Sequence, residues 1–303
     1  MPMIESRHGV LVVDKPADVT SAGVVAKIKK MLGAKKVGHT GALDPFATGV
    51  LLCCINKATK LARFFLQSRK TYRTLLYLGV ETDTQDATGQ VTARGNISDI
   101  TPGRVQEAVG SFVGELDQQP PAFSALKHKG TPLYKLARQG TPVLKPPRRV
   151  TIDRIDVRQT SLPEVEFDVS CSAGTYIRTL CADIGRQLGC GGHLKALRRL
   201  ESSRFSVTEA LSIEDVAELL RRDAVWDRVI SMADALRGVP AWNAEPELME
   251  KIAHGRPLTQ VDAKEIQIPG DGLIKVVDGS NRLLAVVRHR QRTQDFKYEG
   301  VFI

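Results

Sequence analysis

The stretch GHTGALDPFATG, residues 38–49, places one acidic side chain among residues that control the backbone. Asp44 stands directly before Pro45, and a residue in that position is confined to extended geometry, which restricts the direction of its side chain. Glycines before and after it allow a bulky planar substrate to come close. A single carboxylate held in this way can act as a nucleophile or as a base. The stretch therefore predicts a catalytic aspartate, which needs a nearby cation to keep it ionised.

Two other interpretations fit the same residues. Asp44 could cap a helix with Pro45 in its first turn, which would stabilise that helix by about 1 kcal/mol. A glycine-rich loop can also bind phosphate through its N–H groups, but this one lacks the GK[ST] ending of a P-loop and carries an acid instead of a cation. The bunched apolar residues of VLLCCI (50–55) look like a buried strand, which fits poorly with the helix.

The elements that must position Asp44 follow both strand and helix patterns. Strand patterns occupy 9–13, 50–55, 71–80, 149–159 and 164–173. Helical patterns follow a cap at Thr20 or Ser21, cover 58–70 and 174–189, and follow a cap at Thr101. Residues 118–140 form a long excursion rich in Pro, Gly and Lys, and a boundary near Gly238 precedes a short helix and further strands. These patterns predict an α+β (mixed α/β) core and a small β-rich appendage.

Length and charge limit the class of protein. A chain of 303 residues favours two domains. Residues 238–303 hold nine Lys/Arg and nine Asp/Glu, so the net charge of +9 belongs to residues 1–237, where a polyanionic partner would bind. The five cysteines form no CxxC pair, which favours reduced, buried thiols. With no signal-peptide pattern and no apolar run near ~20 residues, we expect a cytoplasmic protein without membrane contact.

Five collinear stretches resemble the TruB family of pseudouridine synthases. They are residues 9–21, 38–49, 70–89, 120–140 and 172–200. The resemblance implies the pseudouridine synthase fold, a mixed and largely antiparallel central sheet flanked by helices. It also implies a catalytic domain over 1–237 with an RNA-binding insertion at about 118–150, followed by a small β-rich, PUA-like RNA-binding domain over 238–303.

The resemblance implies isomerisation of uridine 55 in the T-loop of tRNA, after the base is flipped out, with no cofactor and no metal. The implied partner is the T-stem-loop of tRNA, bound by a monomer without an obligate protein partner. Three alternatives stay open. They are a noncatalytic tRNA-binding or folding protein on the same scaffold, a guide-RNA-dependent relative, and a sugar-phosphate or nucleotide hydrolase.

The same resemblance assigns catalytic roles to Asp44, Arg178 and Tyr72. Asp44 is the essential carboxylate, which attacks C1′ or acts by another route. Arg178 is its cation, because a guanidinium favours the charged form of a carboxylate. Tyr72 stacks on the uracil, a contact worth roughly 1–3 kcal/mol per base. From the residues alone, Arg178 could be solvated on an early helical turn and Tyr72 could be ordinary cross-strand packing.

Further residues are implied in substrate and RNA binding. His39 fills the space that the extruded base leaves, Tyr176 contacts the base or the nucleophile, Leu197 helps to wall the uracil pocket, and Lys15 lies near the site. From the residues alone, His39 could be exposed or a satisfied hydrogen-bonding group, and Leu197 could be helix core. Phosphate contacts are expected from basic side chains of the insertion and of the stretch after it: Lys127, Lys129, Lys135, Arg138, Lys145, Arg148, Arg149, Lys195, Arg198 and Arg199. Each of these could instead belong to an ordinary solvated face.

Overall fold

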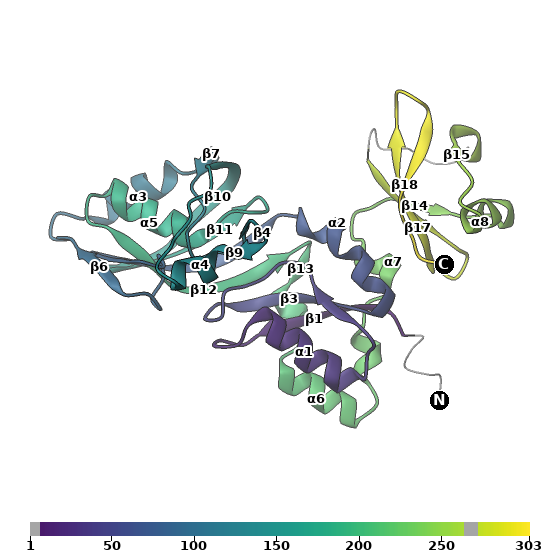
Figure 1. Cartoon of the computed structure of the whole chain (residues 1–303), viewed down its shortest axis with the longest axis horizontal. Coiled ribbons are helices and arrows are strands. Elements are labelled where there is room, and N and C mark those ends of the chain that lie inside the picture. The colour runs from purple at the N-terminus through teal and green to yellow at the C-terminus, as the bar shows by residue number, and fades with distance from the viewer. Residues whose placement is uncertain (1–6, 264–271) are drawn as a thin grey trace.

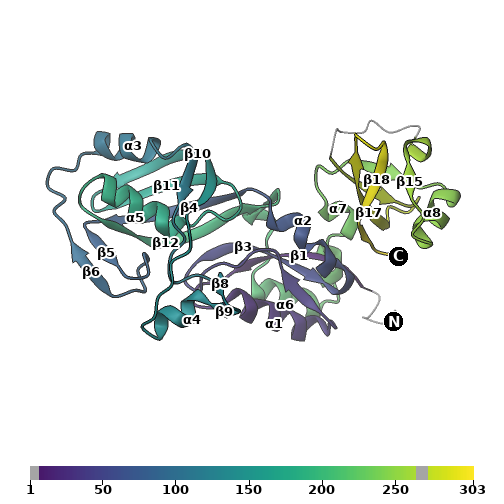
Figure 2. The same cartoon turned by 45° about the horizontal axis from the view of Figure 1, so that its top comes forward.

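The computed structural model describes residues 7–263 and 272–303. Two parts of the molecule share one large sheet, and a third part carries the C-terminal strands (Figures 1 and 2). The sheet runs in the order β1-β3-β12-β4-β11-β10-β7, with β2 added to β3 and β13 added to β12. Its strands are β1 (Gly9–Lys15), β2 (Val37–His39), β3 (Thr48–Ile55), β4 (Lys70–Leu78), β7 (Gly114–Gln118), β10 (Arg148–Ser161), β11 (Glu164–Cys171), β12 (Gly192–Ser202) and β13 (Phe205–Ser206).

One parallel pairing joins the two halves of this sheet. Strands β3 and β12 run parallel and pair at Arg198↔Thr48 and Arg199↔Gly49, whereas the other pairs within the sheet are antiparallel. Gly49 has φ +102°, and a Cβ there would lie 2.2 Å from the carbonyl oxygen of Arg199, so only glycine fits. The sheet is therefore mixed and largely antiparallel, as the sequence predicted.

Helices cover the sheet on the faces where its strands are apolar. In β1, Val10 and Val12 enter one hydrophobic cluster and Leu11 and Val13 enter another, so both faces of this strand are buried. The helices are α1 (Ser21–Leu32), α2 (Ala62–Leu66), α3 (Pro102–Gly110), α4 (Leu133–Arg138), α5 (Ile177–Gln187), α6 (Ile213–Arg221), α7 (Met232–Ala235) and α8 (Pro246–Ala253). Helices α1 and α6 cover the β1–β3 half, and α3 and α5 lie over the other half (Figure 1).

Two short hairpins form two-stranded sheets of their own, apart from the large sheet. β5 (Val80–Thr82) pairs with β6 (Val91–Arg94), and β8 (Lys127–His128) pairs with β9 (Thr131–Pro132). Single 3₁₀ turns are η2 (Asn56–Leu61), η3 (Val207–Glu209), η4 (Val225–Arg228) and η5 (Gln260–Ala263). The second hairpin and α4 belong to the predicted insertion, which lies beside the β1–β3 half in Figure 2.

The C-terminal strands form a separate five-stranded sheet in the order β14-β16-β17-β18-β15. They are β14 (Ala241–Asn243), β15 (Leu258–Thr259), β16 (Leu273–Val277), β17 (Leu283–Arg290) and β18 (Asp295–Val301). Trp242, Ile274 and Phe296 pack in a core of their own, while Leu283 and Phe302 pack into a cluster shared with the large sheet. The predicted β-rich appendage is confirmed; the division at 237 and 238 stays a prediction, and 1–6 and 264–271 lie outside the described residues.

Three expectations about local structure need correction. Leu197 is not helix core, because it lies in strand β12 and pairs with Thr74. The helical pattern over 58–70 contains a 3₁₀ turn and only the short helix α2 before strand β4 begins at Lys70. No helix follows Asp44, whose carbonyl accepts a turn hydrogen bond from Ala47 N (3.1 Å). Among the described helices, none is long and apolar enough to cross a membrane.

Candidate active site

The loop that carries Asp44 is fixed from two sides. The Ser21 hydroxyl, at the start of α1, accepts a hydrogen bond from Leu43 N (2.8 Å) and donates to Leu43 O (3.1 Å). The fully buried ammonium of Lys15 donates to the carbonyls of Pro45 (2.8 Å), Pro16 (2.8 Å) and Val19 (2.6 Å). The residues before and after Asp44 are therefore held by groups outside the loop.

The glycines of the loop differ in their surroundings, and one of them is needed for close packing between strands. Gly49 is required because strand β12 passes against it, whereas a Cβ at Gly38 would meet only a Thr59 methyl at 3.7 Å. The expectation that these glycines admit a substrate is therefore replaced, at Gly49, by close contact between two strands.

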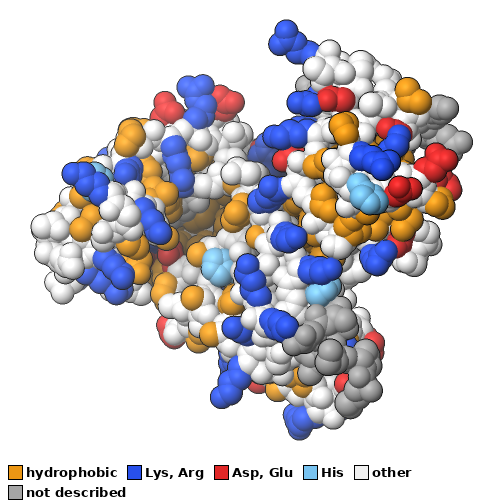
Figure 3. Space-filling model, turned by 45° about the vertical axis from the view of Figure 1, so that its right-hand side comes forward, with side chains coloured by type: hydrophobic (Ala, Val, Ile, Leu, Met, Phe, Trp, Pro, Cys, Tyr) orange, Lys and Arg blue, Asp and Glu red, His pale blue; other side chains and the backbone are white. Residues whose placement is uncertain are grey.

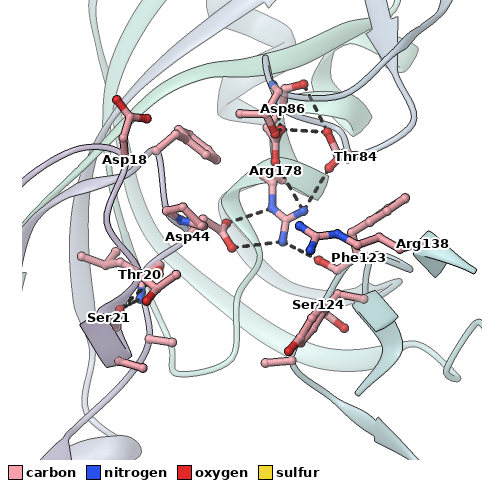
Figure 4. A pocket seen from close by; sticks show the side chains of 18 of the residues that line it. Asp18, Thr20, Ser21, Asp44, Thr84, Asp86, Phe123, Ser124, Arg138 and Arg178 are labelled. Atoms are coloured by element: carbon pink, nitrogen blue, oxygen red, sulfur yellow. Dashed lines mark hydrogen bonds and ion pairs between the residues drawn. The ribbon is translucent and has the colours of Figure 1, made fainter. Parts of the chain in front are cut away.

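Arg178 is the cation that Asp44 needs. It is the second residue of α5 and is 5% exposed, so the solvated alternative is wrong. Its Nε lies 3.0 Å from Asp44 Oδ2, and its Nη2 donates to Asp44 Oδ1 at 3.4 Å. The guanidinium also donates to Thr84 O (3.0 Å) and Phe123 O (2.9 Å), as Figure 4 shows. Its orientation is therefore set by backbone carbonyls as well as by Asp44.

A second carboxylate, Asp86, completes this group and was missed in the sequence. Asp86 is buried, and its Oδ2 lies 3.5 Å from Arg178 Nη1. Its Oδ1 accepts hydrogen bonds from the hydroxyls of Thr84 (2.7 Å) and Thr88 (2.6 Å). The signal in the sequence was the run TDTQDATG (82–89), which concentrates hydroxyl and carboxyl groups.

Burial and neighbouring charges act in opposite directions on Asp44. Burial raises the pKa of Asp44, and the charge of Asp86 raises it further. Arg178 and Lys15 lower the pKa, but the balance stays above the ordinary value. The neighbouring Arg178 therefore favours the ionised form of Asp44, against the effect of burial.

These groups face a pocket of about 780 Å³, a volume typical of small-molecule sites. Its wall includes Asp44, Arg178, Asp86, His39 and Arg138. The pocket therefore brings together three predicted site residues, Asp44, Arg178 and His39, with one basic residue of the insertion.

His39 lies at the end of β2 and is half-buried. Its Nδ1 accepts a hydrogen bond from Gly41 N at 3.4 Å. Burial, followed by the charge of Arg199, lowers the pKa of His39, which favours the neutral ring. The exposed alternative is therefore wrong for His39.

Three other predicted residues lie outside the pocket wall. Tyr72, on β4, is partly buried against the core beside β12, and burial raises the pKa of its phenol. Tyr176 precedes α5, and its backbone N–H and carbonyl both pair with the side chain of buried Gln118 (2.7 and 3.0 Å). Leu197 is buried in β12. None of these three residues is among those that line the pocket.

Two predictions about basic residues need correction. Lys15 has no exposed surface, and its ammonium is used by backbone carbonyls, so it braces the Asp44 loop instead of lining the pocket. Arg199 is 2% exposed and donates to Val50 O (2.7 Å) and Gly41 O (3.1 Å), so it is not available to a phosphate. Both cations stabilise loops from within the fold.

The remaining basic residues differ in their exposure. Lys127, Lys129, Lys135, Arg138, Arg149 and Lys195 are exposed. Lys195 pairs with Glu164, and Arg198 is half-buried and pairs with Asp14 (2.6 Å). Arg148 is half-buried, with its guanidinium 4.5 Å from the ring of Tyr176. Figure 3 shows Lys and Arg side chains around a hollow in the surface and onward toward the C-terminal sheet.

Comparison with known proteins finds family models and named relatives that match this chain. Residues 29–177 match the model of the TruB family pseudouridylate synthase (N terminal domain), and residues 178–237 match that of the tRNA pseudouridylate synthase B C-terminal domain. A protein of Syntrophotalea carbinolica named tRNA pseudouridine synthase B is 47% identical, over 83% of this chain and 82% of its own. A protein of the same name from Syntrophus aciditrophicus is 43% identical, over 92% of this chain and 90% of its own length.

A solved structure has a similar fold over nearly the whole length of this chain. The crystal structure of a Cbf5-Nop10-Gar1 complex contains a chain that superimposes with a TM-score of 0.75 at 25% identity, over 97% of this chain and 85% of that chain. The fold expected from the sequence is confirmed by this similarity. On these findings, the chain belongs to the TruB family of pseudouridylate synthases.

Proposed function

We propose that this chain converts uridine to pseudouridine in tRNA, at position 55 of the T-loop. The reaction class is supported by family membership and by relatives named tRNA pseudouridine synthase B. The observation that carries the proposal is the Asp44 carboxylate, paired with Arg178 at 3.0 Å on the wall of a pocket. A noncatalytic tRNA-binding protein has no need for an acid paired and oriented in this way.

The reaction breaks the bond between ribose C1′ and uracil N1 and forms a bond between C1′ and C5. The proton on C5 is lost and N1 gains one, so the atoms balance without water, oxidant or cofactor. Asp44 acts either on C1′, displacing the uracil, or by another route at the base or ribose. Arg178 keeps Asp44 charged and aimed through its Nε and Nη2.

The target uridine must leave the folded T-loop before it can reach Asp44. Extrusion costs a few kcal/mol, offset by stacking in the enzyme and by filling of the vacated space. We assign the filling role to His39, which reaches the pocket from β2. Tyr72, Tyr176 and Leu197 are proposed to contact the uracil.

The phosphates are proposed to contact the exposed basic residues Lys127, Lys129, Arg138, Arg149 and Lys195, with Arg148 and Arg198 at the edges. The division into a catalytic domain over 1–237 and a PUA-like domain over 238–303 is part of the same proposal. So are a monomeric state, action without a protein partner and a cytoplasmic location.

The test uses purified protein alone with an unmodified tRNA transcript. We expect pseudouridine at position 55, detected by carbodiimide labelling and mass spectrometry, and none in a transcript with cytidine at that position. Tight binding of both transcripts without any product would instead support the noncatalytic alternative. Activity only after addition of a guide RNA would support a guide-dependent enzyme, and release of free base would support a hydrolase.

A further inference from the structure

Five serine and threonine side chains line the pocket, and one of them differs from the other four. Four are paired with protein groups: Thr20 with Gly23 N, Ser21 with Leu43, and Thr84 and Thr88 with Asp86. The fifth is Ser124, in the predicted insertion. Its Oγ is buried and has no hydrogen-bond partner among the described residues. A buried hydroxyl without a partner is unfavourable and calls for an explanation.

The backbone around Ser124 is held in place. Tyr134 N donates to Ser124 O at 3.0 Å, which ties this residue to α4. The carbonyl of the preceding residue, Phe123, accepts from Arg178 Nη2 at 2.9 Å. Ser124 is only 3% exposed. The backbone that carries this unpaired hydroxyl is therefore fixed beside α4 and Arg178.

The same contacts place Ser124 near the reacting centre. Arg178 Nη2, which binds Phe123 O, also donates to Asp44 Oδ1. In Figure 4, Asp44 approaches the guanidinium from one side, while Phe123 and Ser124 lie on another. Since the proposed function puts ribose C1′ beside Asp44, groups bonded close to C1′ are the nearest candidates for a ligand of Ser124. The ribose 2′-hydroxyl is one carbon away from C1′.

Resting on the proposed function, we propose that Ser124 Oγ hydrogen-bonds the 2′-hydroxyl of the extruded target ribose. Two hydroxyls are chemically matched because each can donate and accept. The contact also gives the pocket a means to prefer RNA over DNA, since the 2′-hydroxyl is the group that distinguishes them. Ser124 is then a substrate-binding residue, and its missing partner is supplied by the RNA.

A double-mutant cycle between protein and substrate tests this pairing. Wild type and Ser124→Ala are compared on a T-stem-loop RNA that carries either uridine or 2′-deoxyuridine at the target position, with single-turnover rates as the readout. We expect Ser124→Ala to slow the uridine substrate about 10-fold, as for a lost neutral hydrogen bond, and to leave the rate on the deoxyuridine substrate unchanged. Equal slowing of both substrates would overturn the assignment to the 2′-hydroxyl. No slowing of either would overturn the role of Ser124.

Ser21→Ala is the matched control, because Ser21 lines the same pocket but is already paired twice with Leu43. Its effect should be the same on both substrates. Thermal unfolding separates binding from structure. Ser124→Ala should keep or raise the melting temperature, because it removes an unpaired buried hydroxyl, whereas Ser21→Ala should lower it. A marked fall in the melting temperature of Ser124→Ala would assign Ser124 to folding and overturn the proposal. If wild type makes no product on uridine, the proposed function itself fails.

Discussion

Arg178 and Arg138 line the same pocket, but their surroundings differ. Arg178, on the α5 side, is 5% exposed and contacts Asp44, Asp86 and two backbone carbonyls. Arg138, on the insertion side, is exposed, with its guanidinium 5.7 Å from the ring of Tyr134. The organised wall, which consists of Arg178 with Asp44 and Asp86, has its contacts in place before any RNA arrives, as electrostatic catalysis requires. Arg138 leaves its charge in solvent, which suits phosphate contacts that position RNA.

The strongest test of the organised wall is Arg178→Lys. A lysine keeps the charge but cannot present Nε and Nη2 together to Asp44. We expect the single-turnover rate to fall on the order of 100-fold with little change in tRNA affinity. Arg186→Lys is the control, since Arg186 is on the same helix but exposed and paired with Asp183. Equal rates for wild type and Arg178→Lys would contradict the claim that orientation matters.

Lys15→Met tests the hydrogen bonds by which Lys15 holds the loop that carries Asp44. The substitution leaves three backbone carbonyls without their donor, so we expect the free energy of unfolding to fall by about 3 kcal/mol in urea titrations. Burial lowers the pKa of Lys15 from 10.5 to about 8. Between those values the unfolded chain binds the extra proton, so wild type should gain stability relative to Lys15→Met as the pH rises. If the stability of wild type relative to Lys15→Met instead falls as the pH rises through this range, the predicted direction is wrong.

Asp86→Asn tests the electrostatic balance at Asp44. The charge of Asp86 raises the pKa of Asp44, so its removal should lower that pKa. Since the proposed reaction requires an ionised Asp44, the acidic limb of the pH–rate profile should move to lower pH in the variant. Asp83→Asn, in the same loop but exposed and bonded to Gln90 N, should leave the profile unchanged. A shift toward higher pH would show that Asp86 acts mainly by other means.

The smallest effect is expected from exposed lysines of the insertion that do not line the pocket. Replacing Lys127 and Lys129 together by alanine should weaken tRNA binding several-fold and reduce the salt dependence by about two phosphate contacts, with the single-turnover rate at saturation unchanged. Lys27→Ala with Lys29→Ala, an exposed pair of the same spacing on α1, is the control. A loss of rate at saturation would place the insertion lysines in the organised wall after all.

The sequence predicted much of the fold because its patterns are local. The caps at Thr20 and Thr101 and the strand β3 after the Asp44 loop are where the sequence placed them. The strand character of 192–202 was not foreseen, because β12 is set by pairing with β4 and β3 at distant positions. Tertiary pairing overrides the helical appearance of LKALRRL.

The site was predicted unevenly for a related reason. Asp44 was identified by its unusual neighbours in the sequence, and Arg178 only through the family resemblance. Asp86 was missed because its role arises from a contact with Arg178, far away in the sequence. Lys15 and Arg199 were placed in substrate or RNA binding, although both are buried beneath the loop. Burial of a cation depends on carbonyls that fold around it, and no local pattern shows them.

The central claim is that the paired carboxylate of Asp44 performs the reaction. Asp44→Asn keeps the shape of the side chain and removes its charge, and its effect is best measured as single-turnover pseudouridine formation on saturating tRNA. Asp183→Asn is the control, since Asp183 is also paired with an arginine but lies outside the pocket wall. We predict a loss of about 10⁴-fold or more for Asp44→Asn, with tRNA still bound. Wild-type rates in that variant would contradict the account.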